Sequence, residues 1–312
     1  VQKAQNSWFM DVQKIKQDLI KNNQGINWVP DHIKHGVFEK TIEQAPDWCI
    51  SRNRYWATPM PVWEADDGER IVVSSVKEIE ELSGKKVKDL HRPYIDEFVF
   101  KKNGKEFKRR TEVLDSWVEA GSMPFAQIHY PFENGKKFEK NFPGDYIVEY
   151  TGQVRAWFQR MHIISTLLFN SRSFNNVVVT GVMAGSDGRK MSKSYKNYAD
   201  PKEILESFGG DALRLYLMGS PLMLAENANF DEEALKTKLK NTLNPLWNSL
   251  KYFLIFANEF QWKSEKLGVS EDILDKWILV RLNQTITEIS DNIEKYTIPP
   301  AVRAIETFVD DL

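Results

Sequence analysis

The spacing of hydrophobic and polar positions changes several times along the chain, and each change predicts a different element. Residues 176–182 form a nearly continuous apolar run, which is typical of a strand buried on both faces of a parallel sheet. Residues 145–149 predict another strand, and apolar residues at helical spacing predict a helix over 153–169. Because strands and helices alternate through 111–220, we expect a doubly wound α/β domain there.

A capped helix is predicted to follow this apolar run. Asp200 is a suitable N-cap, Pro201 stands at the first helical position, and Glu203 is suitably placed in the first turn. Gly209 and Gly210 are predicted to stop the helix before a further helical segment begins.

Residues 62–110 have the pattern of a small β-rich insertion. Two hairpins, with turns at 66–68 and 103–104, flank a short helix that Ser75 is predicted to cap and Gly84 to end. The mixture of short alternating strands and one short helix differs from the longer elements that follow, so we predict a separate small module.

Residues 231–312 are predicted to be helical throughout. Asp231 caps a long segment that we expect to be interrupted at Pro245. A second helix is predicted to begin at Ser270, and a third at Pro299.

Composition narrows the class of protein. The chain has 312 residues, 42% hydrophobic and 28% charged, which is typical of a globular protein, and a net charge of −2. It has no apolar run near the roughly 18 residues that span a bilayer, so we expect no membrane segment. Bulk positive charge is absent, so any RNA contact must come from local patches. The single cysteine, Cys49, excludes an internal disulfide and favours a cytoplasmic location.

Metal binding by the protein itself is not expected. One cysteine cannot supply a pair of zinc thiolates, and the five histidines are scattered. Only His32 and His35 stand close together, without a third ligand nearby. The sequence therefore predicts no bound zinc or other metal.

The loop at residues 185–194 carries the strongest chemical signal. It follows the apolar run at 176–182 and concentrates the charges of Arg189, Lys190 and Lys193 where α/β folds bind ligands. Ammonium groups on flexible stems suit a polyphosphate whose charge moves during reaction. A solvated surface loop is the alternative that the residues alone leave open.

Several motifs together resemble the class I aminoacyl-tRNA synthetases. The loop matches their KMSKS signature, and residues 47–56 are similar to a tryptophan-rich segment of the isoleucine, valine and leucine enzymes. Residues 113–127 and 129–134 are most similar to the isoleucine-specific members. The resemblance covers nearly the whole chain. The signature residues are Lys190, Met191, Ser192, Lys193 and Ser194.

The resemblance implies roles for individual residues. Lys190 and Lys193 would act in catalysis on ATP, which is bound with Mg²⁺ as a substrate. Glu149 and Gln153 match residues that contact the aminoacyl-adenylate. Trp117 matches one wall of the isoleucine pocket. Trp157 matches the other wall of the isoleucine pocket. The resemblance also implies that tRNA(Ile) is the acceptor of the activated amino acid.

Purely structural roles are the alternative for several of these residues. Both tryptophans could be core aromatics, and Glu149 could be a solvated carboxylate. Arg52 and Arg54 are predicted to form surface ion pairs rather than bind phosphate. His162 is predicted to be a packed histidine rather than a base. The chain also departs from the family pattern, with Ala57, Tyr150, Gly152 and Ala156 at positions where other residues are usual.

The resemblance also predicts the domain boundaries. Residues 1–234 would be the C-terminal half of the catalytic domain, the second half of a Rossmann-like sheet, with 62–110 inserted. Residues 235–312 would begin a helical anticodon-binding domain. The HIGH signature of the first half does not occur in the sequence, and Val1 is not an initiator methionine. We therefore expect a fragment of a monomeric enzyme that is inactive in isolation.

Two other hypotheses remain at this stage. A valyl- or leucyl-tRNA synthetase would share the lysine loop but not the 113–134 stretch. A tRNA-binding fragment without catalysis is the second. Residues preceding Val1 would discriminate between an enzyme and a non-catalytic fragment.

Overall fold

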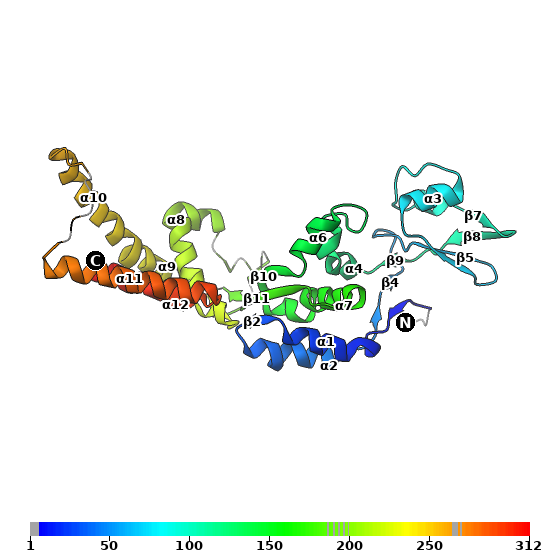
Figure 1. Ribbon diagram of the computed structural model, residues 1–312, viewed down its shortest axis with the longest axis horizontal. Helices are drawn as coiled ribbons and strands as arrows, with labels where there is room; N and C mark the ends of the chain where they lie inside the picture. Colours follow the sequence, from blue (N-terminus) through cyan, green and yellow to red (C-terminus); the bar gives the residue numbers. More distant parts are fainter. Residues whose placement is uncertain are drawn as a thin grey trace. The chain divides into compact units, whose positions relative to one another are not determined.

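The computed structural model describes residues 6–185, 187–189, 191–192, 194–195, 197–198, 200–263, 268 and 270–312. They form two compact units. The first comprises residues 1–26, 34–145 and 152–175, and the second comprises 27–33, 146–151 and 176–312. Figure 1 shows the elements in chain order. Within the described ranges, none of the helices combines the length and apolarity needed to cross a membrane.

Helix α7 (Trp157–Phe169) is the centre of the first unit. It packs against α1 (Lys16–Gln24) and against α4 (Ser116–Gly121). Phe158, Met161 and Ile163 are almost completely buried on α7. The helix was predicted from residue 153, but Thr151–Arg155 form a 3-10 turn and the backbone of Ala156 (φ −123°, ψ −101°) separates it from α7.

Short elements complete this part of the first unit. The strands are β1 (Phe9–Met10) with β3 (Trp48–Cys49), and β4 (Ser51–Arg52) with β9 (Val113–Leu114), both pairs antiparallel. The helices here are the 3-10 helix Gln13–Ile15, the π-helix Lys34–Glu39, α2 (Lys40–Glu43), α5 (Met123–Ala126) and α6 (Gly135–Asn141).

The small β-rich module contains the elements that its sequence predicts, a four-stranded antiparallel sheet with one helix. Strand order is β6-β5-β8-β7, formed by β5 (Val62–Ala65), β6 (Arg70–Val72), β7 (Phe100–Lys102) and β8 (Lys105–Arg109). Helix α3 (Val76–Ser83) is capped by Ser75, whose Oγ accepts from the Glu78 amide, and ends at left-handed Gly84. A 3-10 turn spans Tyr94–Glu97. The module core contains Trp63, Ile79, Phe100 and Phe107.

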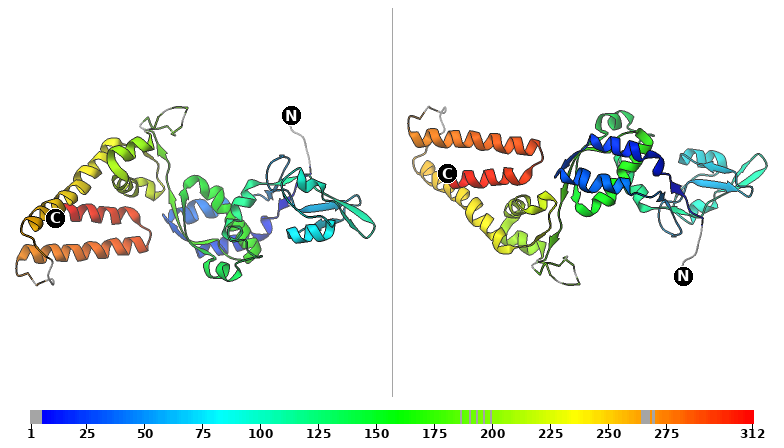
Figure 2. Two further views of the ribbon diagram at one scale, coloured as in Figure 1. Left: turned by 90° about the horizontal axis from the view of Figure 1, so that it is seen from above. Right: turned by 90° about the horizontal axis from the view of Figure 1, so that it is seen from below.

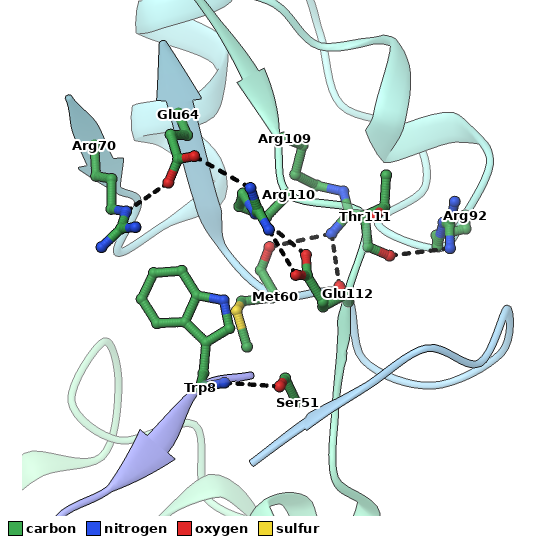
Figure 3. Close-up of polar contacts among 10 residues, drawn as sticks. All are labelled: Trp8, Ser51, Met60, Glu64, Arg70, Arg92, Arg109, Arg110, Thr111 and Glu112. Carbon is green, nitrogen blue, oxygen red and sulfur yellow. Dashed lines mark hydrogen bonds and ion pairs between the residues drawn. The ribbon is translucent and has the colours of Figure 1, made fainter. Parts of the chain in front are cut away.

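Arginines at the end of β8 tie the module to the strands beside it (Figure 3). Arg109 donates to the carbonyls of Met60 and Glu112, at 3.2 and 3.0 Å. Arg110 reaches both Glu64 and Glu112. These contacts join the two ends of the inserted segment, so the module is held at its base by ionic and backbone contacts.

The second unit contains a three-stranded sheet in the order β10-β11-β2. Its strands are β10 (Gly144–Tyr150), β11 (Phe174–Thr180) and β2 (Asn27–Val29), and β2 lies parallel to β11. Val177, Val178 and Val179 are buried, as the apolar run predicts. The strand ends at Thr180, earlier than predicted, because the Gly181 and Val182 amides donate to Leu222 and Asn227 instead of to a strand.

Helices account for most of the other described residues of the second unit, and the helices predicted within 231–312 are present. They are α8 (Pro201–Met218), the turn Pro221–Leu224, α9 (Glu232–Lys238), the π-helix Leu239–Leu243, α10 (Asn244–Glu259), α11 (Ile273–Glu294) and α12 (Ile298–Asp311). Helices α11 and α12 run side by side in opposite directions (Figure 2). Strand β12 (Met183–Ala184) pairs with β13 (Ala228–Asn229) in parallel.

Two predicted helix breaks have different outcomes. Gly209 (φ 81°, ψ 158°) breaks the helical path inside α8, as its sequence predicts. Pro245 does not interrupt the helix. It lies in the first turn of α10, where proline is well tolerated, and the irregularity is the π-helix just before it.

Candidate active site

Hydrogen bonds among Asp187, Arg189, Ser192 and Asn197 connect described residues of the lysine loop. The Asn197 amide donates to Asp187 Oδ1 at 3.0 Å and to the Arg189 carbonyl at 3.3 Å, and its oxygen accepts from the Ser192 amide at 3.1 Å. Arg189 pairs with Asp187 at 2.8 Å and stacks over the Tyr195 ring. These contacts connect the described residues on the two sides of the loop.

The two lysines of the loop, Lys190 and Lys193, lie outside the described residues. Of the remaining signature positions, Met191 is half-buried, and the Ser192 and Ser194 hydroxyls lie 3.0 Å apart. The predicted catalytic role of the lysines stays a prediction.

A cavity of about 690 Å³ adjoins the loop within the second unit. Its wall includes Tyr150 at the end of β10, Gly188 of the loop, and residues 181–184 after β11. Gly181 is required there, because a Cβ atom would lie 1.8 Å from the Glu226 carbonyl oxygen. The Asn227 side chain accepts from the Val182 amide at 2.9 Å. The result is a cavity of mixed polar and apolar lining next to the lysine loop.

Glu149 precedes Tyr150 at the end of β10, in the unit that holds the cavity. Its carboxylate accepts from the Tyr150 amide at 3.1 Å, and the residue is half-buried. The strand prediction for this segment is confirmed. The contact of Glu149 with an adenylate stays a prediction.

The other predicted site residues belong to the first unit. Gln153 accepts from the Trp157 amide at 3.1 Å, and the Trp157 indole N–H donates to the Ala120 carbonyl of α4 at 2.9 Å. Trp117 lies in the first turn of the same helix and is 37% exposed. The structure therefore connects Trp157 with the helix that carries Trp117.

Buried polar residues behind these tryptophans were not identified as site residues from the sequence. The Asp115 carboxylate accepts from the Arg52 guanidinium, from the Trp48 indole and from the Trp117 amide. Arg52 thus forms an ion pair, as predicted, but its partner Asp115 is buried and not at the surface. The sequence could have predicted that Asp115 caps a helix. It could not have predicted the contacts with Trp48 and Arg52, because these residues are distant in the chain.

His162 is a packed histidine, as predicted. It is completely buried on α7, with Nε2 2.9 Å from the Leu19 carbonyl and its ring against Phe38. Burial lowers its pKa to about 4. A neutral ring so far from solvent serves packing rather than proton transfer.

A second cavity, of about 570 Å³, lies in the first unit beside the small module. Its lining includes Met60, Trp63, Ile79 and Arg109, and is mainly apolar. As for metals, no cluster of three His, Cys, Asp or Glu side chains suited to an ion occurs among the residues that the structure describes.

Comparison with known proteins identifies the family. Residues 1–230 match the family described as tRNA synthetases class I (I, L, M and V). The chain is similar in fold to the LeuRS of Agrobacterium radiobacter K84 in a ternary complex with tRNA and LeuAMS (TM-score 0.66, 20% identity, 86% of this chain and 36% of that one). It also resembles Mycobacterium tuberculosis methionyl-tRNA synthetase in complex with methionyl-adenylate (TM-score 0.70, 15% identity, 98% and 52%). The chain belongs to the class I tRNA synthetases.

Its sequence relatives are more specific. Over its whole length the chain is 44% identical to the isoleucine–tRNA ligases of Protochlamydia amoebophila and Chlamydia muridarum. It spans 30% of the length of each of these proteins.

Proposed function

We propose that this chain forms part of an isoleucine–tRNA ligase and carries its lysine loop and amino-acid pocket. The observation that carries the proposal is the 44% identity to isoleucine–tRNA ligases across the whole chain, including the segments that hold Trp117 and Trp157. The cavity beside the lysine loop is of a size and wall chemistry that suit a nucleotide.

The proposed reaction has two steps. In the first, a carboxylate oxygen of isoleucine attacks the α-phosphorus of ATP, and the bond to the bridging oxygen breaks to release pyrophosphate. In the second, the terminal ribose hydroxyl of tRNA(Ile) attacks the acyl carbon of the adenylate, and AMP leaves. Neither step needs a covalent bond to the enzyme, so the protein contributes orientation and charge stabilisation.

Each predicted site residue has a part in this scheme. Lys190 and Lys193 neutralise the charge that builds on the leaving pyrophosphate, and Mg²⁺ enters as part of the ATP substrate. Glu149 and Gln153 orient the adenylate. Trp117 and Trp157 form flat apolar walls for a branched aliphatic side chain.

The remaining parts of the proposal concern the whole protein. It is a cytoplasmic enzyme that acts as a monomer, with residues 1–234 in the catalytic domain and 235–312 at the start of the anticodon-binding domain. Identity to isoleucine–tRNA ligases favours isoleucine over valine or leucine as substrate.

A chimeric ligase tests the proposal, because the chain spans 30% of its relatives. In the Protochlamydia protein, this chain replaces the matching segment, and isoleucine-dependent ATP–pyrophosphate exchange is measured. We expect exchange with isoleucine, and none from the purified 312-residue chain alone. A folded chimera that activates valine or leucine in preference to isoleucine would contradict the assignment.

The proposed role of Lys193 is tested in the same chimera. Lys193→Ala is expected to lower the exchange rate far more than the affinity for isoleucine, because its charge acts on the phosphates. The neighbouring Lys202→Ala, whose side chain pairs with Glu206 on the exposed face of α8, is the matched control. Equal exchange rates in the unmutated chimera, Lys193→Ala and Lys202→Ala would contradict the proposed role of Lys193.

A further inference from the structure

Asp115 holds one end of the helix that carries Trp117. The residue is 5% exposed, and its Oδ1 accepts from the Trp117 amide at 3.2 Å, as an N-cap. The Asp115 carbonyl accepts from the Val118 amide at 2.8 Å. The first turn of α4, and with it the Cα–Cβ direction of Trp117, is therefore set by one carboxylate.

The other oxygen of Asp115 is bound by the tryptophan-rich segment. Oδ2 accepts from the Trp48 indole at 3.0 Å and from Arg52 Nη2 at 2.5 Å. Arg52 Nη1 in turn donates to the carbonyls of Cys49 and Ser51, at 2.8 and 2.9 Å. Arg52 thus locks the backbone of its own strand while it neutralises Asp115.

A second guanidinium completes the cluster. Arg160 of α7 lies over the Trp48 ring at 4.5 Å. Burial lowers the pKa of Arg160, and the charge of Asp115 acts in the opposite direction. The Asp115 carboxylate therefore lies among groups from β3 and β4, from α4 and from α7. A change in its charge would alter its interactions with all three parts.

The far end of α4 is also held. The Trp157 indole donates to the Ala120 carbonyl, and Gly121 allows α4 to approach the Arg160 backbone closely. Helix α4 is consequently fixed at its N-terminus by Asp115 and at its C-terminus by α7. Neither contact uses the Trp117 side chain, which is 37% exposed.

We propose that Asp115, paired with Arg52, is a positioning residue that sets the orientation of Trp117 and thereby the discrimination between isoleucine and valine. This inference rests on the proposed function. Recognition of one methylene depends on close packing of the pocket wall, and yields about 10–200-fold selectivity at most. A small rotation of the wall therefore removes a large part of the selectivity without removing the reaction.

The test uses Asp115→Asn in the chimeric ligase. Asparagine keeps an oxygen that can cap α4, but it loses the charge that holds Arg52. We expect the KM for isoleucine to rise and the ratio of kcat/KM for isoleucine to that for valine to fall about tenfold, within the range such pockets provide. The KM for ATP is expected to change by less than about twofold, since the proposed role of Asp115 concerns the amino-acid pocket and not the lysine loop.

Arg52→Gln is the second variant, and it removes the same ion pair from the other side. It is expected to reproduce the loss of selectivity while Asp115 remains in place. Glu112→Gln is the matched control, because Glu112 is another buried carboxylate of the first unit and pairs with Arg110 at 2.8 Å (Figure 3). It is expected to change stability without changing the isoleucine-to-valine ratio.

The outcomes separate the two proposals. If the unmutated chimera favours isoleucine and both Asp115→Asn and Arg52→Gln, folded by circular dichroism, keep the ratio, the positioning role is wrong. If only one variant folds, its ratio alone decides. A merely structural role would lower the fraction of active enzyme and scale both substrates equally. Absence of exchange in the folded, unmutated chimera would instead contradict the proposed function and this inference with it.

Discussion

The Asn197 side-chain amide donates a hydrogen bond to the Asp187 carboxylate, 3.0 Å away, and closes the lysine loop across ten positions. The same amide group also bonds to the Arg189 carbonyl and the Ser192 amide. Gly185 makes this closure possible, since a Cβ atom there would lie 2.3 Å from the Asn197 carbonyl oxygen. One side chain therefore holds both sides of the loop.

Removal of this side chain is expected to open the loop. Asn197→Ala loses its three hydrogen bonds to described residues of the loop, each worth about 1 kcal/mol net. Tryptic cleavage after Arg189, followed by mass spectrometry on the folded chain, should accelerate about tenfold or more where cleavage follows the open population. Asn141→Ala, which removes one exposed helical hydrogen bond on α6, is the control. Equal cleavage rates in the variant and the wild type would show that Asn197 does not close the loop.

The Asp187 carboxylate of this loop should become protonated only at low pH. The hydrogen bond from Asn197, followed by those from Arg189, lowers the pKa of Asp187 to about 2 from its ordinary 3.8. Because the folded pKa is depressed, the stabilisation from the carboxylate is complete above pH 3.8 and is lost as the pH falls through about 2. A carboxyl-carbon NMR titration should place Asp187 near 2, and Asn197→Ala should raise the value. A midpoint at 3.8 in the unmutated chain would contradict the arrangement.

His162 is expected to make the first unit acid-sensitive at a higher pH. Its folded pKa of about 4 lies below its ordinary 6.5, because the buried ring is desolvated. Nδ1 has no hydrogen-bond partner among the described residues, so protonation would bury an unsatisfied N–H. Stability from the neutral ring is complete above pH 6.5, falls as the pH drops to about 4, and amounts to about 3 kcal/mol at most.

Urea denaturation at several pH values measures this effect. His162→Gln, which keeps a side-chain N–H for the Leu19 carbonyl but does not titrate, should flatten the slope between pH 6.5 and 4. His129→Gln is the control, because His129 is exposed. An unchanged slope in His162→Gln would assign the acid sensitivity to other groups.

Gly121 should be intolerant of a methyl group. A Cβ atom there would lie 2.8 Å from Ile164 Cδ1 and 3.1 Å from the Arg160 carbonyl carbon and oxygen. The Ile164 side chain can move, but the α7 backbone cannot, so α4 must shift away. We expect Gly121→Ala to lower the free energy of unfolding by about 1–3 kcal/mol. Gly135→Ala on α6, where a Cβ atom meets nothing within 4 Å, is the control, and equal stabilities would contradict the packing.

Local signals in the sequence were sufficient for much of the fold. Ser75 and Gly84 begin and end α3, and Asp200 and Asp231 cap their helices, because a cap depends on atoms a few residues away. The apolar run that forms β11 is equally local in origin, since its burial follows from its own composition. The lysine-loop motif also depends on neighbouring residues alone, which is why the amino-acid sequence suffices to recognise it.

Only the tertiary structure decided which distant groups meet. Strand β2 was not predicted, and it joins the sheet by pairing Asn27 with Asn176. Arg52 had no partner in its own segment and finds Asp115, while Trp157 finds the Ala120 carbonyl of another helix. These contacts depend on how helices and strands pack within each of the two units. Packing depends on the shape and charge of the whole folded unit. Short-range sequence patterns therefore predict the helices, the strands and the lysine-loop motif, but they do not predict which distant residues these contact.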